Sequence, residues 1–371
     1  MFSLHNSYII IHTDNVRRNV RSILAALPAG CELIPVLKGD AYGLGLSRMA
    51  EVMCEFEEIR TIAVSQVAEA AALPETGRDV MLIGAVCGDE QLRFAAERGL
   101  IVPAFRRGIV TELARQARSL GTKGRVNIKL NCGLNRFGAA PGVELDALID
   151  ELESCGDDII IEGVYGHFSD LQSPDGDRAA SECARFTVGL AQLFFRGIRT
   201  PKKHLCASAG FELHPEMARD AVRIGRRIYY DNPKSPTGGI LDAASWRTSV
   251  AAVRVLRAGE SIGYSGTFTA AGYTRIGIIP VGYGDGLKAE LAAAGAPVLI
   301  NGRRARLVGC CMDCAFVELG DAECAVGDEV TLFGYDSMGN LLPGQEVAGY
   351  MDDEAVTLTA ALTNRVQRVY E

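Results

Sequence analysis

Several reactive side chains in this sequence come directly after short apolar runs of the kind that form buried strands. Lys38 closes the run PVL at 35–37 and is followed by GDAYG, which contains Tyr42. A lysine at the end of a buried strand is costly unless its amine is neutral or covalently used. Later runs add further candidates of the same kind, namely Lys129, Arg136, His167, Ser208, Arg223 and Gly225.

Each of these residues alone also has an ordinary structural explanation. A lysine can emerge into solvent where a strand ends, and an arginine on a strand usually pairs with a neighbouring carboxylate. Together, however, they bring lysine, arginine, histidine, a hydroxyl group and glycine amides to the ends of several strands. That combination suits an anionic, carbonyl-bearing cofactor or substrate.

The elements that must position these residues follow a β/α pattern. Between about residues 32 and 228, eight predicted strands in ~200 residues indicate an α/β fold of the (β/α)8 TIM-barrel type, whose strand ends share one mouth. A doubly wound open sheet is the alternative, although no GxGxxG follows an early strand. The predicted strands are 32–37, 59–64, 79–83, 100–104, 125–130, 159–164, 203–206 and 221–228, and the predicted helices include 46–56, 66–73, 89–98 and 179–195, after a first helix capped by Thr13 or Asp14 and stopped by Gly30.

The pattern changes near residue 240. Residues 232–239 (NPKSPTGG) read as a loop, and the runs beyond them alternate without long crossover helices. We therefore predict a barrel domain over 1–240 and a β-rich domain over 241–371. Within the second domain, Asn301-Gly302 predicts a hairpin over 296–305, a helix is expected from Glu346 to Tyr350 onward, and a last strand over 365–370.

Composition excludes several classes of function. The chain has 48% hydrophobic and 23% charged residues, so it is not of the disordered type, and its net charge of −8 argues against a nucleic-acid surface. No apolar run reaches the length of a membrane span, and the N-terminal segment MFSLHNSYIIIHTDNVRRNV lacks a basic leader, so we expect a cytoplasmic protein without a membrane partner. Cys311 and Cys314 form a single CxxC without a second pair or a histidine cluster, so no metal is expected.

Collinear motifs across both domains resemble the alanine racemase family. The first, VLKGDAYG at 36–43, is similar to the pyridoxal-phosphate signature of that family. The others follow in the same order along the chain: VNIKLNCGLNRFG at 126–138, YGHF at 165–168, VRIG at 222–225, AGESIGY at 258–264, PVGYGDG at 280–286 and CMD at 311–313. The resemblance implies a barrel with a β-rich C-terminal domain, the cofactor pyridoxal 5′-phosphate, and the interconversion of L- and D-amino acids by two bases.

The resemblance also implies a role for each matching residue. Lys38 would bind the cofactor covalently and serve one face of the substrate, and Tyr264 would serve the other face from the second subunit of a homodimer. Arg136 and the Met312 backbone would bind the substrate carboxylate. The remaining matches would hold the cofactor or support the site. Tyr42, Ser208 and the amides of Gly225 and Arg226 would hold the phosphate, and Arg223 would meet the pyridine nitrogen and, with His167, support Tyr264 from behind the cofactor. Lys129 matches a lysine that the family often carbamylates to position Arg136, and Asp313 stands beside Met312.

Departures from the family pattern leave the substrate open. The family usually has Asp at the position of Asn131, Asn at Ala207, a Pro-Gly-Ile turn where this chain has Ile224-Gly225-Arg226, and Tyr at Asn364. We expect alanine as the substrate, and serine or a larger amino acid are the alternatives. An amino-acid decarboxylase of the same fold is the main alternative, which Arg223 and the absence of a CESGD segment disfavour. A non-catalytic cofactor-binding protein is the other, which the second domain and Tyr264 disfavour.

Overall fold

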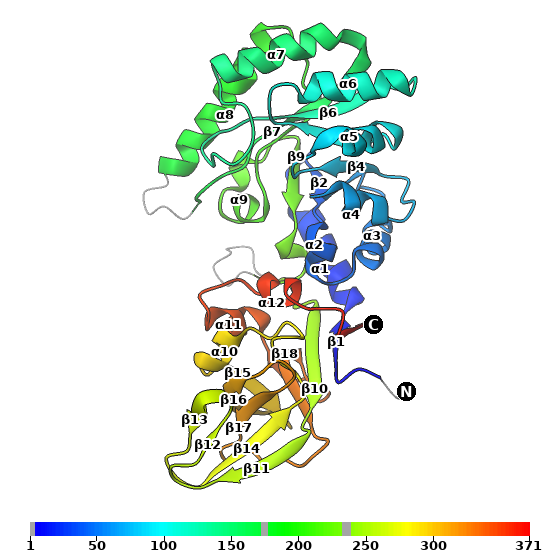
Figure 1. Cartoon of the computed structure of the whole chain (residues 1–371). Coiled ribbons are helices and arrows are strands. Elements are labelled where there is room, and N and C mark those ends of the chain that lie inside the picture. Colours follow the sequence, from blue (N-terminus) through cyan, green and yellow to red (C-terminus); the bar gives the residue numbers. More distant parts are fainter. Residues whose placement is uncertain (1–3, 172–176, 232–238) are drawn as a thin grey trace.

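The computed structural model describes residues 4–171, 177–231 and 239–371. Figure 1 shows a β/α domain at the top and a β-rich domain at the bottom, joined where β1, β10 and α12 lie. The α/β fold class with a β-rich C-terminal part is thus confirmed. The predicted loop at 232–239 lies outside the described residues, except for Gly239. No helix in the described ranges is long and apolar enough to cross a membrane.

Within the described residues, eight parallel strands form the barrel. Strands β3 to β8 pair in chain order, β2 pairs with β9, and single parallel bridges from Val36 to Ala63 and from Ala207 to Arg223 link the two groups into a closed ring. All eight predicted strands are present, but β9 ends at Ile224, earlier than predicted, because Gly225 turns the chain. The strands are β2 (Glu32–Pro35), β3 (Thr61–Val64), β4 (Asp79–Leu82), β5 (Ile101–Ala104), β6 (Gly124–Lys129), β7 (Ile159–Tyr165), β8 (Lys203–His204) and β9 (Ala221–Ile224).

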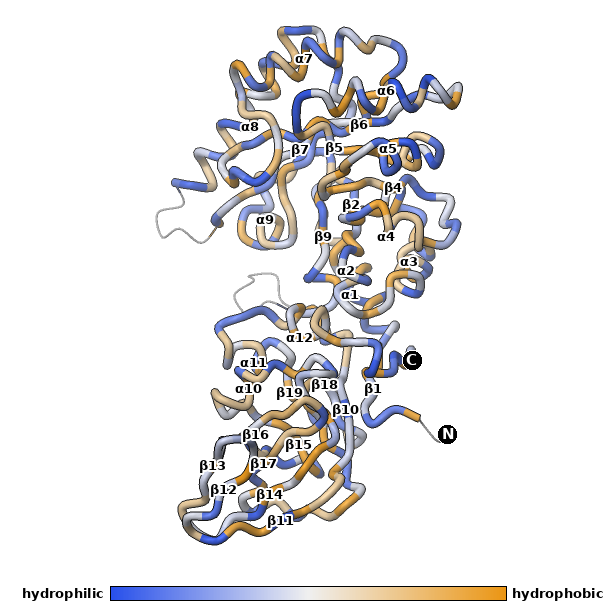
Figure 2. Tube along the Cα trace, viewed as in Figure 1, coloured by the Kyte–Doolittle hydropathy of each residue, from blue (hydrophilic) through white to orange (hydrophobic). Residues whose placement is uncertain are grey.

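Helices connect the barrel strands, and in Figure 2 hydrophobic and hydrophilic residues alternate along outer helices such as α6 and α7. The prediction that Thr13 or Asp14 caps the first helix is wrong. His12 occupies the N-cap without a side-chain cap bond, because the Thr13 hydroxyl donates instead to the backbone carbonyl of Glu371 at 2.6 Å. The helix ends before Leu27, whose extended conformation is the one that Pro28 favours. The helices are α1 (Thr13–Ala26), α2 (Lys38–Tyr42), α3 (Leu46–Cys54), α4 (Val67–Ala72), α5 (Gly88–Glu97), α6 (Ile109–Ser119), α7 (Val143–Cys155), α8 (Asp177–Phe195) and α9 (Ser208–Leu213).

The second domain is built on a mostly antiparallel sheet. The predicted hairpin is confirmed, because Ile300 pairs with Arg303. Asn301 and Gly302 have φ of 50° and 74°, and positive φ at both central residues is what a two-residue type I′ turn requires. The elements are β10 (Ala244–Ser249), β11 (Ala252–Leu256), β12 (Ser261–Ile262), β13 (Phe268–Thr269), β14 (Thr274–Ile279), α10 (Ala289–Ala293), β15 (Pro297–Ile300), β16 (Arg303–Cys310), β17 (Ala315–Glu318), β18 (Glu329–Tyr335), β19 (Leu341–Leu342), α11 (Gly344–Gly349), α12 (Val356–Ala360) and β20 (Gln367–Tyr370).

An N-terminal strand also belongs to the sheet of the second domain. Strand β1 (Ser7–Ile11) pairs antiparallel with β10 and parallel with β20, so residues from both ends of the chain share one sheet. The sequence pattern assigned this segment to the barrel domain. The boundary near residue 240 stays a prediction, to which the structure adds this N-terminal strand.

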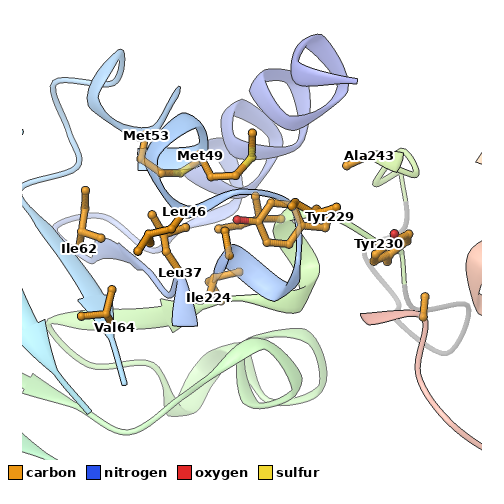
Figure 3. Packing of buried hydrophobic residues seen from close by; sticks show 14 of the residues in the cluster. Leu37, Leu46, Met49, Met53, Ile62, Val64, Ile224, Tyr229, Tyr230 and Ala243 are labelled. Atoms are coloured by element: carbon orange, nitrogen blue, oxygen red, sulfur yellow. The ribbon is translucent and has the colours of Figure 1, made fainter. Parts of the chain in front are cut away.

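A continuous apolar core supports the mouth of the barrel. Leu37 and Ile224, which precede Lys38 and Gly225 in the chain, are fully buried. Figure 3 shows them packed with Leu46, Met49 and Tyr229 around the turn that carries Lys38. Because close-packed side chains leave little room for movement, this packing holds the backbone of the candidate site in place.

Candidate active site

A cavity of about 330 Å³ lies at the carboxyl ends of the barrel strands. These ends are where barrels of this type collect their functional residues. Nine of the predicted site residues line the cavity, namely Lys38, Tyr42, Lys129, Arg136, His167, Ser208, Arg223, Gly225 and Arg226. The structure therefore brings them together, while their individual roles stay predictions.

Lys38 and Tyr42 reach the cavity from a left-handed turn, α2. Gly39, Asp40 and Ala41 have φ/ψ of 64°/47°, 56°/45° and 53°/48°, and Tyr42 also has a positive φ of 57°. For residues other than glycine this conformation costs about 1–2 kcal/mol each. The surrounding structure must therefore hold the turn in place.

Contacts from both domains fasten this turn. The Gly39 amide donates to Glu69 Oε1 at 2.6 Å, and the Leu46 amide donates to Asp40 Oδ1 at 2.7 Å. On the other side, a side chain at Gly43 would overlap the backbone carbonyl of Thr359, so α12 of the second domain packs directly against the turn. The position of Lys38 thus depends on both domains.

Burial, with the nearby positive charges, lowers the pKa of the basic groups in the cavity. Partial burial is the main cause that lowers the pKa of Lys38, and the positive charge of Arg136 lowers it further. Burial and then Arg223 lower the pKa of Lys129 to about 7 and that of His167 to about 2. His167 is therefore neutral at physiological pH, and both lysines have more neutral amine than a solvent-exposed lysine. A neutral amine is the form that attacks a carbonyl group or carbon dioxide.

The lowered pKa of Lys129 makes stability depend on pH. Between the folded pKa near 7 and the ordinary lysine pKa, the unfolded chain binds a proton that the folded chain does not, so the free energy of unfolding rises with pH. Relative to Lys129→Met, we expect the wild type to gain about 2 kcal/mol between pH 7 and pH 9. Urea unfolding of both proteins in buffer free of carbon dioxide measures this difference, and parallel pH responses would contradict it.

Several backbone carbonyls and two histidines hold the Arg223 side chain in place. Nη1 donates to the His204 backbone carbonyl at 3.0 Å and lies 2.6 Å from His204 Nδ1, and Nη2 donates to the carbonyls of Gly166 and Leu205 at 2.7 and 3.0 Å. Nη2 also lies 3.4 Å from His167 Nδ1. Within the described ranges, Nε has no acceptor. Burial lowers the pKa of Arg223 to about 10, which leaves it protonated at neutral pH with one N–H group to offer a ligand.

Hydroxyl and amide groups gather at one end of the cavity. The Gly225 amide donates to Ser208 Oγ at 3.2 Å, and a Cβ atom at position 225 would overlap the Tyr42 hydroxyl. The backbone at Gly225 therefore lies so close to Tyr42 that no residue other than glycine fits there. Neutral donors that converge in this way are typical of phosphate sites.

Arg136 comes from the loop between β6 and α7. The Asn131 side chain organises this loop, because its Oδ1 accepts the amides of Gly133 and Asn135 at 3.3 and 3.0 Å. The amide oxygen of Asn131 thus closes this loop. Arg136 is exposed on the cavity side, where it can meet an anionic substrate group.

Three predicted residues lie outside this cavity. Tyr264 is 81% exposed, in a short turn after β12, and Met312 is 52% exposed in the turn between β16 and β17. Asp313 pairs with Arg365 at 2.9 Å. These residues belong to the second domain and do not line the cavity of their own chain.

Other cavity residues were missed by the sequence reasoning. Tyr165 packs its ring against Lys129 Nζ at 4.4 Å, and Glu354 and Val356 enter the lining from the second domain. Tyr165 stands in a quoted motif, directly before Gly166-His167, so its position was a usable signal. No local pattern marks Glu354, because its segment meets the barrel only in the folded chain.

A family model described as the N-terminal domain of alanine racemase matches residues 11–233, and one described as its C-terminal domain matches residues 243–370. The chain belongs to the alanine racemase family. Among curated members, it is 31% identical to the alanine racemase of Desulforamulus reducens over 97% of each chain. It is 32% identical to that of Symbiobacterium thermophilum, over 97% of this chain and 96% of the relative.

Solved structures of family members agree along the whole chain. The alanine racemase of Streptomyces lavendulae, a D-cycloserine producer, superposes with a TM-score of 0.91 at 26% identity and covers 100% of this chain and 98% of its own. The Bacillus anthracis enzyme with bound L-Ala-P gives 0.89 at 25% identity, over 100% and 96%. Both structures thus align with the two domains of this chain.

Proposed function

We propose that this protein interconverts L- and D-alanine with pyridoxal 5′-phosphate bound at Lys38. Family membership supports the reaction class, and one observation carries the assignment of the site. The buried guanidinium of Arg223, whose Nε has no acceptor among the described residues, lines a cavity that has a lysine of lowered pKa and a set of phosphate-type donors.

The residues present fit this cofactor. Lys38 would hold its aldehyde carbon, the Arg223 Nε–H would meet its pyridine nitrogen, and Tyr42, Ser208 and the amides of Gly225 and Arg226 would hold its phosphate. When bound, pyridoxal phosphate supplies the electron sink that makes the substrate Cα–H acidic. A protonated guanidinium disfavours protonation of the pyridine nitrogen, so it weakens that sink and, we propose, suppresses decarboxylation and transamination.

Two groups of the protein would move the Cα proton. The Lys38 amine, whose pKa is lowered, would take or return a proton on one face. The hydroxyl of Tyr264 would serve the other face, but a phenol, whose usual pKa is about 10, is a poor base without support. His167 can give that support: its Nδ1 faces Arg223 at 3.4 Å, so the neutral ring carries its proton on Nε2 and can donate it to a phenolate.

The active form would be a homodimer with shared sites. Tyr264 and Met312 are exposed on the second domain and do not line the cavity of their own chain. A second copy of the chain is the partner that could supply them, with the Met312 backbone and Arg136 then meeting the substrate carboxylate. Lys129, if carbamylated, would add an anion that positions Arg136.

We place this enzyme in the cytoplasm.

Chiral chromatography of purified protein incubated with single L-amino acids tests this function. We expect D-alanine from L-alanine and less product from L-serine and larger amino acids. Carbon dioxide without any D-enantiomer would favour the decarboxylase, and neither product, despite a bound cofactor, would favour the non-catalytic alternative.

A further inference from the structure

Two consecutive arginines follow Gly225 at the phosphate end of the cavity. Arg226 Nη2 donates to Glu212 Oε2 at 2.8 Å, and Arg227 Nη1 donates to Glu212 Oε1 at 3.0 Å. Glu212 is completely buried and lies on α9, one helical turn after Ser208. The helix that presents the Ser208 hydroxyl to the cavity therefore also fixes the direction of the Arg226 side chain.

The second domain contacts the same arginine. Glu354, in the segment that precedes α12, places Oε1 3.5 Å from Arg226 Nε. The Glu354 side chain is 54% exposed, so it can turn toward solvent at little cost, whereas Glu212 cannot. Nη1 of Arg226 has no acceptor among the described residues, and Arg226 lines the cavity beside Tyr42, Ser208 and Gly225.

The charges of the groups at this end of the cavity indicate which of them would bind a phosphate most strongly. The other groups at this end of the cavity, two hydroxyls and backbone amides, are neutral, and a phosphate monoester carries a charge of about −1.5 to −2 at pH 7. A hydrogen bond between ionised partners is roughly twice as strong as one between neutral partners. Arg226 is thus the group with most to gain from a phosphate here, and Glu354 is the anion that competes with it.

We propose that the Arg226 guanidinium is a cationic anchor for the cofactor phosphate, oriented by Glu212 and shared with Glu354 of the second domain. This inference rests on the proposed function, because it concerns the phosphate of the same cofactor. The Arg226 side chain would thus bind the phosphate in addition to the Arg226 backbone amide. Glu354 of the second domain would compete with the phosphate for the same guanidinium.

Binding of pyridoxal phosphate and of pyridoxal, which lacks the phosphate, separates this role from a structural one. Full-length enzyme, freed of cofactor by dialysis against hydroxylamine and then against buffer, is titrated with each compound, and visible absorbance reports the bound form. We expect Arg226→Gln to weaken pyridoxal phosphate binding about 10- to 100-fold and to leave pyridoxal binding unchanged. We expect Glu354→Gln to tighten pyridoxal phosphate binding about two- to fivefold, since it removes the competing anion.

Arg60→Gln is the matched control, because Arg60 is exposed before β3 at the opposite end of the barrel, and it should change neither affinity. Equal losses for both compounds in Arg226→Gln would show a structural role and overturn the anchor, as would unchanged affinity for pyridoxal phosphate. A weaker affinity in Glu354→Gln would overturn the competition. If the wild type itself binds no pyridoxal phosphate, the proposed function fails. If the wild type binds it and Arg226→Gln binds it equally well, only the anchor fails, so the two failures can be told apart.

Discussion

Replacing Lys38 by alanine is expected to abolish both the visible absorbance of the purified protein and its racemase activity. Lys38 is the cavity lysine that stands next to the phosphate-type donors, on the same turn as Tyr42. Under the proposed function, its loss would remove the covalent link to the cofactor and one of the two bases. We expect the rate of alanine racemisation to fall by at least about a thousandfold, the scale associated with the loss of such a group.

Absorbance spectra of wild type and Lys38→Ala at equal concentration measure this effect, with racemisation followed in the same samples. Lys129→Met is the informative control, because it removes the other lysine of the cavity and should keep the absorbance band. If the band persisted in Lys38→Ala, or was lost only in Lys129→Met, the assignment of Lys38 would be wrong.

The second large effect concerns Tyr264 and depends on which subunit supplies it. Tyr264→Phe would remove the oxygen that we propose transfers the proton, and it should slow racemisation about 10²- to 10⁴-fold. If sites are shared, a hybrid of one Lys38→Ala subunit and one Tyr264→Phe subunit has one site with neither change. We therefore expect about half the wild-type activity from such a hybrid, although each parent homodimer retains at most about one hundredth of it.

Co-expression of the two variants with different tags, followed by purification on both tags, gives the hybrid. Tyr273→Phe serves as a control, because Tyr273 is another exposed tyrosine of the second domain and should leave activity intact. An inactive hybrid would show that Tyr264 acts within its own chain or not at all, and failure to recover any hybrid would argue against the dimer.

The sequence predicted the barrel well because its signals are local. Each strand is an apolar run bounded by polar residues, and eight such runs separated by helical segments leave few alternative topologies. The Asn301-Gly302 hairpin is local in the same way, because two residues decide the turn. The position of the site followed from one rule, that functional residues stand where barrel strands end.

Features that depend on distant contacts were not predictable. The left-handed turn from Gly39 to Tyr42 runs against the preference of Asp40, Ala41 and Tyr42, and contacts with Glu69 and the backbone near Thr359 hold it. The pairing of β1 with β20 and the Glu354–Arg226 contact join segments far apart in the chain. The wrong cap prediction at Thr13 has the same cause, since Glu371 takes up its hydroxyl.

The most direct test of the account is proton exchange at the substrate Cα. Purified protein with pyridoxal phosphate is incubated with L-alanine in deuterated water, and proton NMR and chiral chromatography follow the product. We predict equal amounts of L- and D-alanine at equilibrium, with deuterium at Cα of the D-enantiomer from the earliest time points. Alanine that stays in the L-form, or that loses its carboxyl group, would contradict the account.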